Sequence, residues 1–148
     1  MKNLNYREIL INSTISVIAD EGLDKTTTKT IVNGTGVNEA YIYRFFDGKE
    51  DLLSKTFAFL DEELVRNIMD RIDVIDMKEL NYEMRCRLIF DSLWRFLLGN
   101  KDKCLAYVRY YYSPYYQKYS VKEHQERYKP LVSKIGKVIK AEANTWML

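Results

Sequence analysis

The strongest constraint on the fold is the spacing of apolar residues, which recur every three or four positions along almost the whole chain. Ile11, Ile15 and Ile18 show this spacing near the N-terminus. No stretch of useful length alternates apolar and polar residues, as a half-buried β-strand would. The pattern therefore predicts an all-α protein.

Capping residues divide the N-terminal part into short helices. Gly22 ends a first helix that starts near residue 6, and Thr26 or Thr27 caps a second helix over 28–35. Gly36 then interrupts the chain before Asn38 caps a third helix over 38–46. Two short helices joined by a tight glycine turn are typical of a helix-turn-helix.

Longer helices are expected in the rest of the chain. Asp47 and Glu50 form a capping-box pattern at the start of a fourth helix that reaches about residue 73. Gly99-Asn100 and Ser113-Pro114 supply later breaks, although Pro114 can also be read as a kink within one helix. The remaining helices are expected over about 77–99, 102–118 and 120–146.

Composition excludes several classes of protein. The chain of 148 residues has one His, no glycine-rich phosphate loop and no cluster of metal ligands, so no enzyme, cofactor or metal site is expected. No apolar run is long enough to span a bilayer, which predicts a cytoplasmic protein without membrane contact. Cys86 and Cys104 lie far apart and are expected to be small core residues.

The stretch 36–53, "GVNEAYIYRFFDGKEDLL", contains the best candidate for a binding surface. At 100° per residue, Ile42, Phe45 and Phe46 share one side of a helix, while the opposite side carries Ala40 and Arg44 with Tyr41 and Tyr43 beside them. Tyr and Arg are residues that reach phosphates and base edges. The alternative is that both tyrosines pack against the neighbouring long helix.

Phosphate contacts are expected beside this helix. Thr27, Thr28 and Lys29 offer hydroxyls, backbone N–H groups and a cation at a helix start, where a phosphate can bind. Lys49 lies in the first turn of the long helix, where a cation is locally unfavourable unless acids balance it or an anion is bound. Glu50 and Asp51 are the acids that can balance it.

The run 9–53 closely resembles the DNA-binding headpiece of the TetR/AcrR transcriptional regulators. The shared landmarks occur in order and without gaps: Ala19 and Gly22, the Thr-Thr before the second helix, Ile31, Gly36-Val37, Ile42-Tyr43, Phe46, Lys49 and Leu52-Leu53. The resemblance implies a dimeric repressor of a palindromic operator in double-stranded DNA, released when a small molecule binds the helical body. It also implies DNA contacts at Thr27, Thr28, Lys29, Asn38, Ala40, Tyr41, Tyr43, Arg44 and Lys49.

The sequence departs from that family's pattern at three places. Glu39 stands where Lys or Gln is common, and its carboxylate would repel phosphates or accept from a cytosine amino group. "NGTG" replaces basic residues, so Gly34 is expected to weaken the second helix by up to about 1 kcal/mol. The chain ends at Leu148, before the two helices that usually build the dimer interface, which suggests a short or truncated variant.

The expected domains are a helix-turn-helix DNA-binding domain over 1–48 and a helical ligand-binding and dimerisation domain over 49–148. The second contains "YVRYYYSPYYQKY", residues 107–119, whose tyrosines either fill the core or line a ligand cavity. His124 is expected to be a face residue with its polar atoms satisfied. For a flat or cationic hydrophobic ligand the expected lining residues are Phe90, Trp94, Tyr107, Tyr110 and Tyr111.

A different reading is a helical interaction module whose helix-turn-helix no longer binds DNA. Residues 1–53 hold six Lys and Arg against eight Asp and Glu, a net charge of minus two, and this balance favours the interaction module. The outward Tyr and Arg residues favour DNA binding instead. The two readings differ in whether the protein discriminates between DNA sequences.

Overall fold

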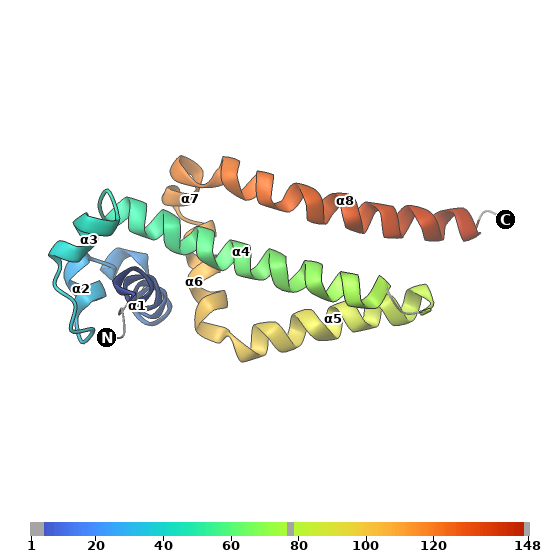
Figure 1. Cartoon of the computed structure of the whole chain (residues 1–148), viewed down its shortest axis with the longest axis horizontal. Helices are drawn as coiled ribbons and strands as arrows, with labels where there is room; N and C mark the ends of the chain where they lie inside the picture. The colour runs from blue at the N-terminus through green and yellow to red at the C-terminus, as the bar shows by residue number, and fades with distance from the viewer. Residues whose placement is uncertain (1–4, 77–78, 147–148) are drawn as a thin grey trace. The chain divides into compact units, whose positions relative to one another are not determined.

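A computed structural model describes residues 5–76 and 79–146, which form helices joined by short loops (Figure 1). Among these residues there is no β-strand, which confirms the all-α prediction. None of the described helices is both long and apolar enough to cross a membrane. The elements are α1 (Tyr6–Glu21), the 3-10 helix η1 (Leu23–Lys25), α2 (Thr28–Val32), α3 (Ala40–Phe45), α4 (Lys49–Asp76), α5 (Tyr82–Gly99), α6 (Lys101–Tyr111), α7 (Pro114–Tyr119) and α8 (Val121–Trp146).

The chain forms two compact units. Unit 1 comprises Met1–Leu60 and Asn100–Val121, and unit 2 comprises Asp61–Gly99 and Lys122–Leu148. The first turns of α4 belong to unit 1, where Leu52 and Leu53 are fully buried. Independent domains divided at residue 48 remain a prediction.

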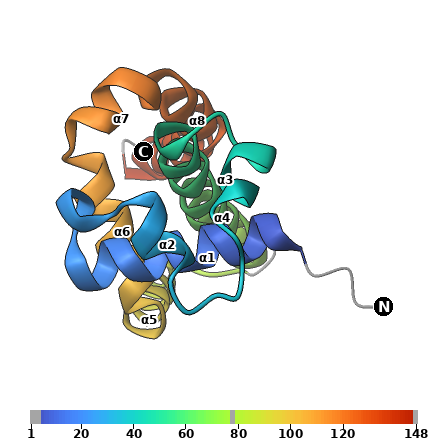
Figure 2. The same ribbon diagram turned by 90° about the vertical axis from the view of Figure 1, so that its left-hand side faces the viewer.

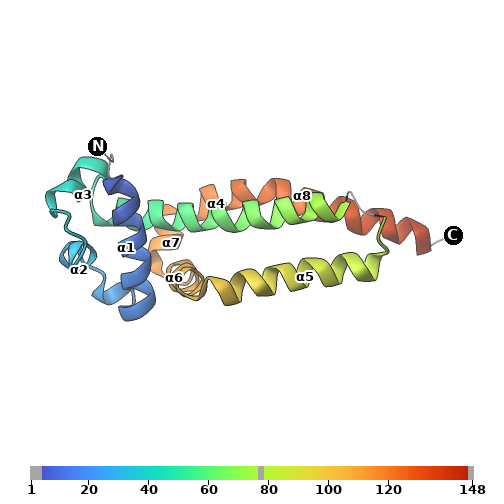
Figure 3. The same ribbon diagram turned by 60° about the horizontal axis from the view of Figure 1, so that its bottom comes forward.

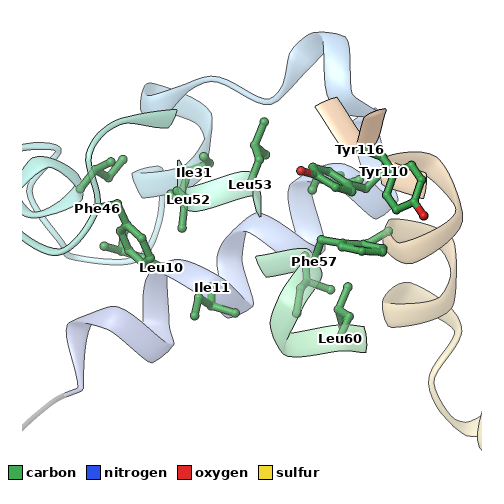
Figure 4. Packing of buried hydrophobic residues seen from close by; sticks show 14 of the residues in the cluster. Leu10, Ile11, Ile31, Phe46, Leu52, Leu53, Phe57, Leu60, Tyr110 and Tyr116 are labelled. Carbon is green, nitrogen blue, oxygen red and sulfur yellow. The ribbon is translucent and has the colours of Figure 1, made fainter. Parts of the chain in front are cut away.

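One apolar core holds unit 1 together (Figure 4). Leu10 from α1, Ile31 from α2 and Ile42 from α3 are all fully buried in it. Phe57 of α4 joins these helices to the tyrosine-rich segment, because its ring centroid lies 4.8 Å from that of Tyr110. The core thus fixes α2 and α3 on a framework made by α1, α4 and α6.

The tyrosines nearest Phe57 serve core packing in unit 1. Tyr110 is 1% exposed, and its hydroxyl lies 2.9 Å from the hydroxyl of Ser120. Tyr107 and Tyr116 also pack on Phe57, with ring centroids 5.0 and 5.6 Å away. Burial with a hydrogen-bonded hydroxyl is how such large aromatic residues usually fill a helical core.

Helix α1 has the bounds that the sequence predicts. Asn5 caps its start by accepting a hydrogen bond from the Glu8 N–H (3.3 Å), and Gly22 ends it with a φ of +88°. The Arg109 guanidinium of α6 donates to the carbonyls of Ile18 (2.6 Å) and Ala19 (2.8 Å) in the last turn of α1. The Ile18 carbonyl also accepts from the Gly22 N–H (3.0 Å), so the guanidinium adds a second donor there and a donor to the Ala19 carbonyl, at a helix end where a positive charge is favourable.

In unit 2 the later turns of α4 lie beside α8 and α5 (Figure 3). The buried carboxylate of Asp61 lies 3.0 Å from His124 Nδ1 and 2.9 Å from a guanidinium nitrogen of Arg127. Lys134 of α8 also pairs with Asp73 of α4. These contacts join α4 to α8 and give His124 Nδ1 a carboxylate partner.

Several expected helix bounds are wrong. Pro114 occupies the first position of α7, so the single helix expected over 102–118 is divided into α6 and α7. Proline suits a first helical turn because it has no N–H to lose there. Helix α5 starts at Tyr82, after Asn81 accepts from the Met84 N–H (2.9 Å), rather than near residue 77. Residues 77–78 of that prediction lie outside the described residues.

Cys86 is exposed on α5, so its expected place in the core is wrong, while Cys104 is half-buried. Helix α5 has no buried residue at all, which explains why a small apolar residue on it stays at the surface.

Candidate nucleic-acid interface

The turn between α2 and α3 depends on two glycines. Gly34 and Gly36 have φ angles of +73° and +72°, a conformation that costs a residue with a Cβ about 1–2 kcal/mol. Helix α2 already ends at Val32, so Gly34 lies in the turn and the expected weakening of that helix is wrong. The Thr35 hydroxyl completes the turn by donating to Val32 O (2.7 Å) and accepting from Val37 N–H (3.0 Å).

A reciprocal cap holds the start of α2. Thr27 Oγ1 accepts from the Thr30 N–H (3.2 Å), and Thr30 Oγ1 accepts from the Thr27 N–H (2.8 Å). Thr27 is thus the cap, while Thr26 is buried and donates to Gly22 O (2.8 Å). Thr27 and Lys29 both face solvent, where an anion can reach them.

Glu39 bonds within the protein, in a way the sequence analysis missed. Its carboxylate accepts a hydrogen bond from the Thr28 hydroxyl, which joins the start of α2 to the start of α3. The bond also occupies a hydroxyl that was predicted to contact phosphate. Beside it, Asn38 Oδ1 accepts from the Ala40 N–H (2.9 Å), and α3 begins at Ala40.

Figure 2 shows α2 and α3 as two short helices joined by a loop. Helix α3 carries aromatic and basic residues. Tyr43 is 64% exposed, and Arg44 and Ala40 also face solvent, while Ile42 is fully buried. Phe45 is 40% exposed, so its expected inward position is wrong. The chain leaves the helix at Phe46 (φ −138°, ψ 154°), and this turn buries Phe46 instead.

Tyr41 and Tyr43 have different roles. Tyr41 is half-buried, and its ring centroid lies 4.7 Å from that of Tyr6 on α1, so it packs on α1 at the edge of the core. The Arg44 guanidinium lies 5.8 Å from the Tyr41 ring, within the range of a cation–π contact. The Tyr41 ring therefore contacts the Arg44 guanidinium, whereas the Tyr43 side chain remains exposed to solvent.

Lys49 begins α4 and lies beside α7. Its Nζ is 5.9 Å from the ring centroid of Tyr115. At the same helix start, Asp51 rather than Glu50 accepts from the Asp47 N–H (3.1 Å), so the expected acid of the capping box is wrong. The first turn of α4 thus carries Lys49, whose ammonium group lies near the Tyr115 ring, and Asp51, whose carboxylate caps the helix start.

Helix α7 contributes a further cation that sequence analysis missed. A hydrogen bond with Tyr119 raises the pKa of exposed Lys118 above its ordinary value, and the charge of Glu50 adds to this effect. The sequence signal that could have revealed Lys118 is its spacing from two tyrosines on the same short helix, Tyr115 and Tyr119.

Taken together, the surfaces of α2, α3 and the start of α4 offer hydroxyl, guanidinium and ammonium donors. Such groups hydrogen-bond to phosphate oxygens and base edges. Among the described residues no group of three or more His, Cys, Asp or Glu side chains is placed to hold a metal ion.

The residues predicted to bind a ligand fall into two groups. Tyr107, Tyr110 and Tyr111 lie with the core cluster of unit 1. Phe90 and Trp94 stack on each other along α5 in unit 2, with centroids 6.3 Å apart and with 63% and 53% exposure. Neither aromatic residue lines the groove of about 420 Å³ that lies between α4 and α5 in unit 2.

The fold and the exposed face of α3 define an all-helical protein with a helix-turn-helix near its N-terminus. Residues 10–56 match the family model for bacterial regulatory proteins of the tetR family. Residues 10–56 therefore form a domain of the TetR family.

Two curated relatives are nucleoid occlusion factors named SlmA. The one from Vibrio cholerae is 30% identical over 100 residues, which is 67% of this chain and 49% of the relative. The one from Salmonella paratyphi B is 30% identical over 88 residues, which is 60% of this chain and 42% of the relative. The chain thus spans less than half the length of these relatives.

Solved structures share the fold at low sequence identity. A TetR family transcription regulator from Marinobacter aquaeolei VT8 matches with a TM-score of 0.77 and 18% identity, over 91% of this chain and 69% of that one. The fatty acid degradation regulator FadR from Bacillus halodurans matches with a TM-score of 0.69 and 17% identity, over 98% and 71%. Both likenesses concern the fold alone.

Proposed function

We propose that this protein is a DNA-binding transcriptional regulator that acts in the cytoplasm as a homodimer on a palindromic operator. The observation that carries the proposal is the exposed pair Tyr43 and Arg44 on α3, together with Thr27 and Lys29 at the start of α2 and Lys49 at the start of α4. Side chains of this kind on the second helix of a helix-turn-helix read bases, while the flanking groups hold phosphates.

The likeness to regulators and to nucleoid occlusion factors supports DNA as the partner. We further propose that the protein represses its target and that a small molecule bound in the helical body lowers its DNA affinity. For this effect the ligand must bind one conformation more tightly than the other, by about 2.7 kcal/mol for a hundredfold change in DNA affinity.

The test is a titration of the protein with DNA at fixed salt concentration. Genomic fragments retained by the purified protein are sequenced, and labelled versions are then titrated against random competitor DNA. We expect some fragments to bind at least about a thousandfold more tightly than the competitor, as specific sites do. Equal affinity for all fragments contradicts sequence recognition.

The second candidate is an interaction module that has lost DNA binding. The observation that favours it is the net charge of minus two over residues 1–53, because clustered acids repel phosphates. Glu39 adds to this charge, although its bond to Thr28 directs it into the protein. If the protein fails to bind any duplex, even at low salt, the interaction module is the better reading.

A further inference from the structure

The groove in unit 2 has a chemistry different from that of the tyrosine-rich segment. It lies between α4 and α5, and its volume of about 420 Å³ is within the range of roughly 300–1,000 Å³ typical of small-molecule sites. Its apolar lining is mostly aliphatic, with one aromatic ring. The apolar residues are Leu64, Ile68, Leu88, Ile89, Leu93 and Phe96.

Two arginines give the groove its charge. Arg71 of α4 and Arg95 of α5 both line it, and both are exposed. Within the described residues neither guanidinium has an ion pair, whereas Arg87 on the same helix α5 is paired with Glu83 (3.2 Å). Asp91 also lines the groove, so the net charge of the lining is plus one.

We propose that this groove binds a free amphiphilic anion, with an aliphatic chain against the apolar lining and a carboxylate held by the charges of both Arg71 and Arg95. Guanidinium groups bind carboxylates through paired, charge-assisted hydrogen bonds, and an aliphatic chain is stabilised by leaving water. The proposal differs from the flat or cationic ligand expected from Phe90, Trp94, Tyr107, Tyr110 and Tyr111, because none of these residues lines the groove. Its regulatory meaning rests on the function proposed above.

The direct test uses three probes that have the same ten-carbon chain: decanoate, decyltrimethylammonium and the neutral decyl maltoside. Each is titrated into the full chain by calorimetry below its critical micelle concentration. We expect decanoate to bind and the cation not to bind, with the neutral probe between them. Equal or tighter binding of the cation overturns the proposal, as does the absence of any decanoate binding.

Matched arginine variants locate the site. Arg71→Ala and Arg95→Ala should each weaken decanoate binding, by about threefold to tenfold for one exposed charge-assisted contact. Arg87→Ala serves as the control, since this arginine is exposed on α5 but does not line the groove. Circular dichroism checks that each variant is folded. A loss with Arg87→Ala equal to that with Arg95→Ala overturns the location.

Two further arms separate this inference from the proposed function and from membrane binding. In the first, decanoate is added to the DNA titration. If decanoate binding depends on Arg95 but DNA affinity does not change, the groove is a binding site without an effector role. A protein that binds no DNA disproves the proposed function, while calorimetry still tests the groove. Binding to anionic phosphatidylglycerol vesicles without binding to monomeric decanoate overturns the proposal in favour of a membrane surface.

Discussion

At the scale of single residues, Arg44 and Lys49 are expected to contribute to DNA binding in different ways. Arg44 lies on the exposed side of α3, next to Tyr43, where the proposed function requires it to reach base edges. Lys49 lies at the start of α4, over the Tyr115 ring, where the proposed function requires it to contact a phosphate. Base contacts specify a sequence, and phosphate contacts do not.

Arg44→Ala should therefore change which bases are preferred, whereas Lys49→Ala should weaken binding to all sequences. Loss of one phosphate contact should also reduce the slope of log affinity against log salt by about one unit. The measurement is a titration of a fragment panel at several salt concentrations. If both variants change preference and salt slope alike, the assigned orientation of α3 is wrong.

Glu39 offers a second test at this scale. Glu39→Gln keeps an oxygen that accepts from Thr28 but removes the negative charge, so affinity for all DNA sequences should rise. Thr28→Val removes the donor and should lower the free energy of unfolding by about 1 kcal/mol, while the control Thr28→Ser should change it less. A rise in DNA affinity for Thr28→Val without a loss of stability contradicts a structural role for this bond.

At the scale of elements, we expect replacement of glycine by alanine to have opposite effects on stability in the turn between α2 and α3 and in helix α8. Gly36→Ala should lower the free energy of unfolding by about 1–2 kcal/mol, because alanine resists the positive φ there. Gly136→Ala, in α8 with open space around its Cβ position, should raise it by up to about 1 kcal/mol. Denaturant unfolding followed by circular dichroism compares the two; equal effects contradict the turn geometry.

The ion-paired carboxylate between α4 and α8 is a second element-scale test. Asp61→Asn removes the buried charge that pairs with Arg127 and should lower the free energy of unfolding of unit 2 by about 2–3 kcal/mol. The loss is smaller than for an isolated ion pair, because Glu123 also pairs with Arg127. Asp70→Asn, exposed on the same helix, is the control and should have little effect. An equal loss in both variants contradicts the importance of the buried contact.

Some local signals in the sequence predict the elements well. Gly22 ends α1 as predicted, and apolar spacing correctly places Ile42 inside. The same wheel fails at Phe45, because it assumes that the helix continues through Phe46. The bond between Glu39 and Thr28 joins residues eleven apart across a turn, and helical periodicity contains no information about such a pair.

At the scale of the whole molecule, a twofold operator requires a twofold protein. Apolar side chains on α5 and α8 support self-association, because Leu98 is 54% and Val132 is 65% exposed. Large exposed apolar groups often mark an interface.

We expect a dimer in sedimentation experiments at micromolar concentration. Val132→Glu should shift the equilibrium toward monomer, whereas Gln125→Glu, exposed on the same helix, should not. A protein that stays monomeric at this concentration and still protects two half-sites contradicts the proposed assembly.

The contact from Arg109 to the end of α1 has a consequence for amide hydrogen exchange. The Ile18 and Ala19 carbonyls are held by a side chain about ninety residues further along the chain, so the last turn of α1 cannot fray freely while α6 is docked. Helix ends normally exchange their amide protons quickly because they open alone. Here the amides of that turn should exchange only as fast as α6 detaches, so their protection reports the docking of the tyrosine-rich segment against the DNA-binding helices.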